Sequence, residues 1–303
     1  MLAAVVVTYN RKGELCKNLE MLNRQTKQID RVYIIDNCST DGTKDFLEEK
    51  GFLGQSNIIY LKTDDNIGGA GGFYTGLRKA FEDGADWVVM MDDDGRPCDE
   101  YTIHELFNYG EKIKAEGIAE GKLFVNSLVI CGDRLTSKIG DLYTISEAEA
   151  EAKDGVLVGA AHPFNGTMVS RPLIKEIGYP NKEYFIKGDE VDYKQRAFDA
   201  GAFIVTVLAS KYYHPYVPTE EKVLFGYKVP VCVEAPWKEY YTARNLTYTY
   251  KKKRRYKMIA FELIFVKLYA ILTMKCQKRK TIKNLFNGLR DGWNGRLGPT
   301  VRP

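Results

Sequence analysis

The N-terminal third of the chain alternates between short apolar runs and segments with helical periodicity. Residues 2–8 form an apolar run typical of a buried strand, and Leu15, Leu19 and Leu22 then recur at helical spacing. The pattern predicts further strands at 31–36, 57–61 and 86–91, and further helices at 41–50 and from the glycine-rich turn 66–72 to about residue 83. Strands that alternate with helices of roughly 10 to 15 residues predict a parallel sheet with helices on both faces.

The pattern becomes less regular from about residue 122 onward. Strands are predicted at 123–131, 156–160, 166–170 and 202–208, and a helix at 189–200. Beyond Pro236 the chain is predicted to be helical almost to Gly288, and no internal repeat is visible. We therefore expect an α/β domain over residues 1–235, built from the halves 1–120 and 121–235, followed by a helical region over 236–303.

Polar residues collect where the predicted strands end, which is where parallel sheets bind their ligands. The ends of the first four strands carry Thr8-Tyr9-Asn10-Arg11, Asp36-Asn37, Asp64-Asp65-Asn66 and Asp92-Asp93-Asp94. Burying ionised carboxylates is costly unless a cation or hydrogen-bond donors compensate, so the three aspartates that end an apolar strand predict a site for a hard divalent ion. The simpler alternative is an exposed acidic turn, since Gly95 and Pro97 follow.

Three other segments could take part in binding or catalysis. The glycine-rich turn at 66–73 opens a predicted helix, so its free N–H groups could receive a phosphate, or its glycines could pack closely on a strand. It does not fit G-x-G-x-x-G, which counts against a dinucleotide-dependent dehydrogenase. Asp189, Glu190 and Asp192 begin a predicted helix, where they could cap it or supply a general base. His214 follows a strand and could be structural or complete a metal shell.

The charge of the chain is distributed unevenly. Residues 251–303 contain 15 Lys or Arg against 2 acids, whereas residues 1–250 contain 29 against 38, so the net charge of +4 hides a strongly basic C-terminal region. Such a region could meet an anionic membrane, a nucleic acid or a lipid-linked phosphate. The six cysteines lack C-x-x-C spacing, which argues against a zinc site or a disulfide framework and favours a reducing compartment. We expect no secretory signal, because strand-like sequence begins at once.

An apolar stretch of 17 residues, 258–274, lies within this basic region. Its Glu262 and Lys267 make a membrane-spanning helix improbable. Together with Lys257 they are spaced by five, so the stretch does not form a clean amphipathic stripe. A buried bundle helix or an oligomer contact is one interpretation, and docking on anionic lipid is the other.

The combination of these motifs resembles the family 2 glycosyltransferases of the GT-A fold. The motifs that carry the resemblance are the opening strand Val5-Val6-Val7-Thr8-Tyr9-Asn10-Arg11, the D-N-x-S-x-D-G segment at 36–42, Asp92-Asp93-Asp94 in the D-x-D place, Gly188-Asp189-Glu190 in the x-E-D place, and the late His214. Their order and spacing match over about residues 1–215. Segments 66–73 and 238–245 look most like the galactofuranosyltransferase and rhamnosyltransferase branch. The order Asp189-Glu190 reverses the usual Glu-Asp pair.

The resemblance implies a Rossmann-like, mostly parallel sheet with helices on both faces and a role for each motif. Residues 1–120 would bind the nucleotide and 121–235 would serve the acceptor and catalysis. The residues expected to bind the nucleotide sugar are Thr8, Tyr9, Arg11, Asp36, Asn66, Gly69, Asp92 and Asp93. Asp92, Asp94 and His214 would ligate Mg²⁺ or Mn²⁺, and Glu190, or else Asp189, would be the catalytic base. The residues expected to contact the acceptor are Asn165, Tyr240 and Arg244.

The implied activity is inverting, metal-dependent transfer of galactofuranose from UDP-galactofuranose to a lipid-linked or growing bacterial cell-surface polysaccharide. A polyprenyl-diphosphate-linked acceptor and an anionic membrane surface, met through residues 251–283, are the expected partners, and a homo-oligomer is possible. We expect a cytoplasmic protein bound peripherally to the inner face of the cell membrane. The alternatives are a rhamnosyltransferase using dTDP-rhamnose, a nucleotidyltransferase, for which no triphosphate loop is found, and a noncatalytic basic scaffold or nucleic-acid binder. No nucleic acid is expected, because the basic region lacks a recognised motif.

Overall fold

The computed structural model describes residues 1–139, 142–216, 220–224, 227–231, 234–253, 256–273 and 277–302. The chain divides into two compact units. The sheet unit comprises residues 1–180 and 193–216, and the helical unit comprises residues 181–192 and 217–303. The acids Asp189 and Glu190 therefore belong to the helical unit, although most of the helix that they begin belongs to the sheet unit.

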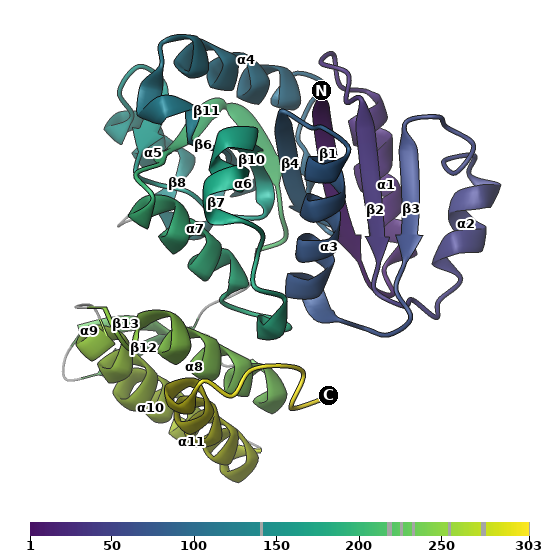
Figure 1. Cartoon of the computed structure of the whole chain (residues 1–303). Coiled ribbons are helices and arrows are strands. Elements are labelled where there is room, and N and C mark those ends of the chain that lie inside the picture. The colour runs from purple at the N-terminus through teal and green to yellow at the C-terminus, as the bar shows by residue number, and fades with distance from the viewer. Residues whose placement is uncertain are drawn as a thin grey trace. The chain divides into compact units, whose positions relative to one another are not determined.

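The four parallel strands predicted for the N-terminal part lie side by side in the order β3-β2-β1-β4 (Figure 1). These strands are β1 Leu2–Thr8, β2 Arg31–Asp36, β3 Ile58–Lys62 and β4 Trp87–Asp92, and the helices between them are α1 Lys12–Asn23, α2 Thr43–Glu49 and α3 Gly68–Glu82. Alternate residues of β1 enter two different cores, one shared with Leu15 and Leu19 of α1 and the other with Phe73 and Leu77 of α3. The predicted cover of helices on both faces is therefore confirmed.

The sheet then continues with antiparallel and parallel neighbours in the order β4-β10-β6-β11-β5. The strands of this part are β5 Arg96–Pro97, β6 Leu123–Cys131, β7 Arg134–Ile139, β8 Leu142–Thr144, β9 Val156–Val158, β10 Asn165–Ser170 and β11 Phe203–Tyr213. The helices are α4 Thr102–Ala115, α5 Ile145–Glu151, α6 Arg171–Ile177 and α7 Asp189–Asp199, with a short 3₁₀ turn, η1 Ile118–Gly121. Two antiparallel steps followed by a parallel one make β11 run in the direction of β4, so both strands end at the same edge.

The helical unit contains the C-terminal region from residue 217 onward, in which a short strand pair precedes the helices. Its elements are η2 Lys182–Tyr184, β12 Glu220–Leu224, β13 Tyr227–Val231, α8 Pro236–Tyr250, α9 Tyr256–Phe261, the π-helical turn η3 Glu262–Val266, α10 Lys267–Thr273 and α11 Lys278–Asn294. A Cβ atom at Gly288 or Gly292 of α11 would lie 2.3 or 2.2 Å from a backbone oxygen of α8, so the two helices pack at a distance that only glycine permits. Among the described residues, no helix has the length and apolar character needed to cross a membrane.

Candidate active site

The site begins where β4 ends and the chain turns back along β11. Asp92 is the last residue of β4, and after Asp93 and Asp94 the short strand β5 pairs with the end of β11, Arg96 opposite Tyr213. The turn passes so close to β11 that a Cβ atom at Gly95 would lie 2.5 Å from the ring of Tyr212. This pairing carries the residue that follows β11, His214, to the aspartates.

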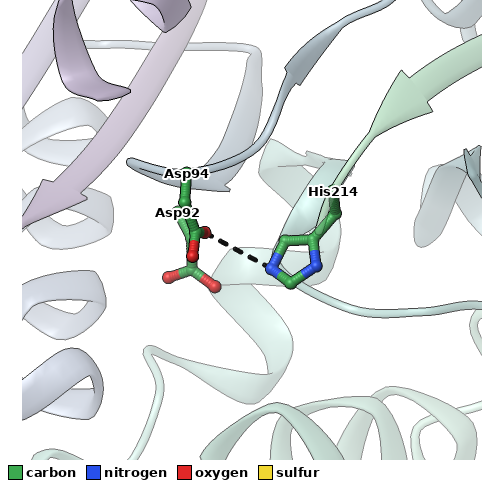
Figure 2. Close-up of side chains that lie close together, drawn as sticks. All are labelled: Asp92, Asp94 and His214. Atoms are coloured by element: carbon green, nitrogen blue, oxygen red, sulfur yellow. Dashed lines mark ion pairs between the residues drawn. The ribbon is translucent and has the colours of Figure 1, made fainter. Parts of the chain in front are cut away.

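Asp92, Asp94 and His214 form a cluster that could hold a metal ion. Each offers one ligand atom, and these atoms all lie within 4.8 Å of one another. Figure 2 shows the three side chains turned toward a common point, with Nε2 of His214 3.4 Å from Oδ1 of Asp94. Two carboxylates and an imidazole from two strand ends are a donor set suited to Mn²⁺ or Mg²⁺.

The surroundings of His214 leave Nε2 for this cluster. Its Nδ1 lies 2.9 Å from the carbonyl oxygen of Pro215, an acceptor, so the ring proton of the neutral form is held on Nδ1. Burial favours the neutral ring, but the Asp94 carboxylate outweighs it and raises the pKa of His214 above the ordinary value. Burial likewise opposes the ionisation of Asp94, but His214 and Arg11 together hold the pKa of Asp94 below its usual range.

Asp93 has a different role from the aspartates on either side of it. Its carboxylate is 5% exposed and accepts hydrogen bonds from Thr8 Oγ1 at 2.8 Å and the Tyr9 backbone N–H at 3.3 Å. Burial raises the pKa of Asp93 to about 6, although the neighbouring Arg11 lowers it. The middle aspartate therefore fastens the end of β1 to the end of β4 and takes no part in the cluster of Asp92, Asp94 and His214.

Arg11 and Tyr9 lie at the open side of this edge. The guanidinium of Arg11 pairs with Asp93 at 3.3 Å and also contacts Asp94, while 52% of its side chain stays exposed. Tyr9 is 45% exposed directly after β1. A cation and an aromatic ring beside an acidic cluster are groups that could receive a diphosphate and a nucleobase.

Asp36, at the end of β2, is fully buried. One carboxylate oxygen accepts the backbone N–H of Ser39 at 2.7 Å, and the other accepts the hydroxyl of Tyr60. The loop after β2 is tied in turn to the loop after β1, since Thr40 N–H donates to Asn10 Oδ1 at 2.7 Å. Asp36 thus holds the loop after β2 in place through buried hydrogen bonds.

The glycine-rich turn combines close packing with an open position. A Cβ atom at Gly72 or Gly76 would lie 2.4 Å from Val7 or 2.3 Å from Val5, so these glycines let α3 approach β1. Gly69, in contrast, has no atom within 4 Å of a built Cβ among those described. The side chain of Asn66 accepts the N–H of Gly68 at 2.8 Å, which forms a tight turn where α3 begins. Packing accounts for part of this turn, and the space beside Gly69 is open among the described residues.

The chain is similar in sequence to proteins of known activity. A family model described as "Glycosyl transferase family 2" matches residues 3–119. The galactofuranosyltransferase GlfT1 of Mycobacterium tuberculosis strain H37Rv is 31% identical over 289 residues, which cover 95% of this chain and 92% of that one. The chain belongs to glycosyltransferase family 2.

A second relative and a solved structure agree with this family assignment. The dTDP-rhamnosyl transferase RfbF of Shigella flexneri is 25% identical over 304 residues, which cover 97% of this chain and 96% of that one. The crystal structure of the mannosyltransferase PcManGT of Pyrobaculum calidifontis, in complex with GDP-Man and Mn²⁺, superposes with a TM-score of 0.57 at 15% identity, covering 97% of this chain and 87% of that one. This structural likeness supports the predicted GT-A fold of the family 2 chain.

The remaining predicted site residues of this family 2 chain lie in three places. Asn165 begins β10 opposite Met91 and is 5% exposed, and its Oδ1 has no hydrogen-bond partner among the described residues. Asp189 is buried and Glu190 partly exposed in the first turn of α7. Tyr240 and Arg244 of α8 are 1% and 0% exposed. Their burial gives the two α8 residues a packing role, and an acceptor contact by either would require the helical unit to open.

Two residues that the sequence analysis did not single out support the site. The ring of His162 lies 6.2 Å from that of His214, and burial lowers the pKa of His162 to about 4, so it is neutral. Asn18 of α1 donates to the carbonyl oxygen of Asp92 at 3.1 Å and so holds the end of β4. Asn18 could have been found, because it shares the apolar helix face of Leu15 and Leu22. His162 carried no such signal beyond being one of three histidines.

Proposed function

We propose that this chain is an inverting, metal-dependent galactofuranosyltransferase that uses UDP-galactofuranose and extends a lipid-linked or growing bacterial cell-surface polysaccharide. The observation that carries the proposal is the 31% identity to a galactofuranosyltransferase over nearly the full length of both chains. The convergence of Asp92, Asp94 and His214 at one edge of the sheet supports the metal dependence.

The donor set fits Mg²⁺ or Mn²⁺. Asp92, Asp94 and His214 would hold the ion, and the Mn²⁺ in the PcManGT complex supports this choice. When bound, the ion would supply positive charge next to the diphosphate that leaves during transfer. Arg11, which is half exposed and already pairs with Asp94, would add hydrogen bonds to the same diphosphate. Tyr9 would stack on the base, and the start of α3 near Gly69 would bind the phosphates.

The acceptor step needs a base from this chain. In the proposed reaction, Glu190 takes the proton from an acceptor hydroxyl while that oxygen attacks the anomeric carbon and the bond from this carbon to UDP breaks. A single displacement inverts the anomeric centre. Glu190 is preferred to Asp189 because it is the partly exposed member of the pair, and a base must reach its substrate.

The choice of donor is tested by the released nucleotide. We expect the purified chain with Mn²⁺ to release UDP from UDP-galactofuranose in the presence of a polyprenyl-diphosphate-linked acceptor, and to lose this activity with EDTA and recover it with added Mn²⁺. Parallel reactions measure kcat/KM with dTDP-rhamnose, the rival donor that the 25% identity to RfbF supports. A higher kcat/KM with dTDP-rhamnose would replace the proposed sugar by rhamnose.

We also propose that the helical unit binds anionic lipids at the inner face of the cell membrane. Four apolar side chains of α9, η3 and α10 are more than half exposed, namely Met258, Phe261, Phe265 and Leu272. Phe261 and Phe265 stack with ring centroids 4.8 Å apart, and the exposed Lys253 and Lys257 lie near them in the chain. Lys267, whose position argued against an apolar stripe, instead pairs with the buried Glu239 at 3.0 Å. Exposed apolar side chains beside lysines are typical of interfacial binding.

Vesicle flotation tests this surface. We expect the chain to float with phosphatidylglycerol vesicles at low salt and to stay behind with phosphatidylcholine vesicles, because lysines attract anionic headgroups and salt screens them. Replacing Phe261 and Phe265 together by serine should reduce flotation by about tenfold or more. Phe198, which is 67% exposed on α7, is the matched control for a lost surface ring. Equal flotation of Phe198→Ser and the double variant would contradict the proposed surface.

A further inference from the structure

The turn that leads into the two acids has an unusual backbone. Phe185, Lys187 and Gly188 have φ values of 64°, 66° and 82°, in the left-handed region that residues with a side chain rarely adopt. The turn follows η2 and ends where α7 begins at Asp189. Such a conformation persists only where the surrounding structure holds it in place.

Asn245 of α8 holds this turn through its amide group. Its Nδ2 lies 3.0 Å from the carbonyl oxygen of Tyr184, 3.0 Å from that of Ile186 and 2.6 Å from that of Lys187. The side-chain amide has two protons and three carbonyl oxygens within reach, so one of the protons is shared between two of these oxygens. A Cβ atom at Gly188 would lie 3.2 Å from Cβ of Asn245, so the turn also packs directly on this residue. Asn245 is 0% exposed, which leaves water no access to these bonds.

Arg244 holds the preceding residues. Its Nη2 donates to the carbonyl oxygens of Glu183 at 3.1 Å and Tyr184 at 2.9 Å, and its Nη1 donates to Gly298 at 2.5 Å. Its Nε donates to Oδ1 of Asn245 at 2.7 Å, which fixes the orientation of the Asn245 amide. A planar guanidinium with several donors in a fixed fork is suited to this multiple attachment.

The turn is also attached to α7 itself. The hydroxyl of Tyr184 lies 3.3 Å from Oδ1 of Asp192, in the first turn of α7, and 2.8 Å from Oγ1 of Thr249 in α8. The N–H of Asp192 bonds the carbonyl oxygen of Gly188 at 2.9 Å. The position of Glu190 therefore depends on a turn whose carbonyl groups are held by α8.

We infer that Arg244 and Asn245 are positioning residues for the catalytic base, so that they set where Glu190 stands and do not bind the acceptor. This inference rests on the proposed function, since it deepens the role given there to Glu190. It requires that loosening the turn harms the proton transfer and leaves donor binding intact.

A double-mutant cycle tests the action through Glu190. Asn245→Ala is expected to lower kcat by roughly 10- to 100-fold, because a displacement of about 1 Å at a reacting group has this effect. The donor KM should change by less than about twofold, because the proposed donor-binding residues lie in the sheet unit. In a Glu190→Gln background the same substitution should cost less than about threefold, since the group that it displaces is then already inactive. An equal loss of kcat in both backgrounds, or a rise in donor KM alone, would overturn the inference.

Hydrogen exchange tests the attachment without any turnover. Exchange of the amides at 185–192 should accelerate by about tenfold or more in Asn245→Ala. Tyr184→Phe, a milder change that removes only the hydroxyl bonds to Asp192 and Thr249, should accelerate exchange at the start of α7 and lower kcat severalfold. Tyr241→Phe is the matched control. Tyr241 lies in α8, as Asn245 does, but its hydroxyl donates to the carbonyl oxygen of Val301 at 2.9 Å and makes no bond to the turn.

The outcomes separate the two proposals. Unchanged exchange in Asn245→Ala and Tyr184→Phe, or equal acceleration in Tyr241→Phe, overturns the positioning role whatever the reaction is. Failure of the wild-type chain to transfer sugar from UDP-galactofuranose counts against the proposed function, and the exchange data still decide whether α8 holds the turn.

Discussion

Replacing Asp94 by asparagine is expected to lower kcat/KM for sugar transfer by roughly 10³-fold and to abolish Mn²⁺-dependent donor binding. Asp94 is the member of the cluster that contacts both His214 and Arg11. Its pKa is held below the usual range, so the carboxylate is ionised at neutral pH and available as a ligand. Asparagine keeps the size of the side chain but removes the charge, so Arg11 and His214 would face a neutral amide.

The measurement is the binding of Mn²⁺ in the presence of UDP, followed by calorimetry or by the electron paramagnetic resonance of the ion, together with steady-state kinetics. Asp86→Asn is the matched control, because Asp86 lies just before the opposite end of the same strand and pairs with the exposed N-terminal ammonium. A surface pair of this kind contributes about 0 to 1 kcal/mol, so the control should keep both binding and activity. Asp94→Asn with wild-type Mn²⁺ affinity would remove the metal site from the proposal.

The parallel part of the fold could be predicted because three of its four strands, β1, β2 and β4, are buried on both faces. Such strands read as continuous apolar runs, and the leucines of α1 show the helical period between them. The expected strand at 202–208 extends in the structure to Tyr213. Its pairing with β6 shifts register between Val207 and Lys211, where polar residues interrupt the apolar pattern. The local pattern therefore ended the strand too early, and the missing part is the one that carries His214 to the site.

The cluster of Asp92, Asp94 and His214 could be predicted from motif order, whereas the partner of each aspartate could not. Asp93 and Asp94 lie in the turn that follows β4, so the alternation of side chains along a strand does not decide which of the aspartates is buried. Asp93 is buried by its contacts with Thr8, Tyr9 and Arg11, which lie 82 to 85 positions away in the chain. The burial of Arg244 could not be predicted, because a buried arginine of a helix and an arginine that faces a substrate can have the same local sequence pattern. Its carbonyl partners at Glu183, Tyr184 and Gly298 are about 60 positions away, and such distant contacts leave no local pattern.

The second large effect is expected for Glu190→Gln, which should lower kcat by roughly 10²- to 10⁴-fold. Glutamine keeps the length of the side chain but cannot take the proton from the hydroxyl of the sugar acceptor. Donor and Mn²⁺ affinities should stay unchanged, because the residues proposed to bind them, such as Arg11 and Asp94, belong to the sheet unit. Kinetics at saturating donor and calorimetry with UDP and Mn²⁺ measure the two quantities separately.

The pH dependence of kcat identifies the base more specifically than the size of the loss. A general base works only when ionised, so kcat of the wild-type chain should fall at acidic pH, and this acidic limb should disappear in Glu190→Gln. Asp189→Asn is the discriminating partner, because Asp189 is buried while Glu190 is partly exposed in the same helical turn. If the asparagine variant lost the acidic limb and the glutamine variant kept it, the base would be Asp189. The reversed order of the two acids would then have no catalytic meaning, because the aspartate would retain the chemistry from the neighbouring position.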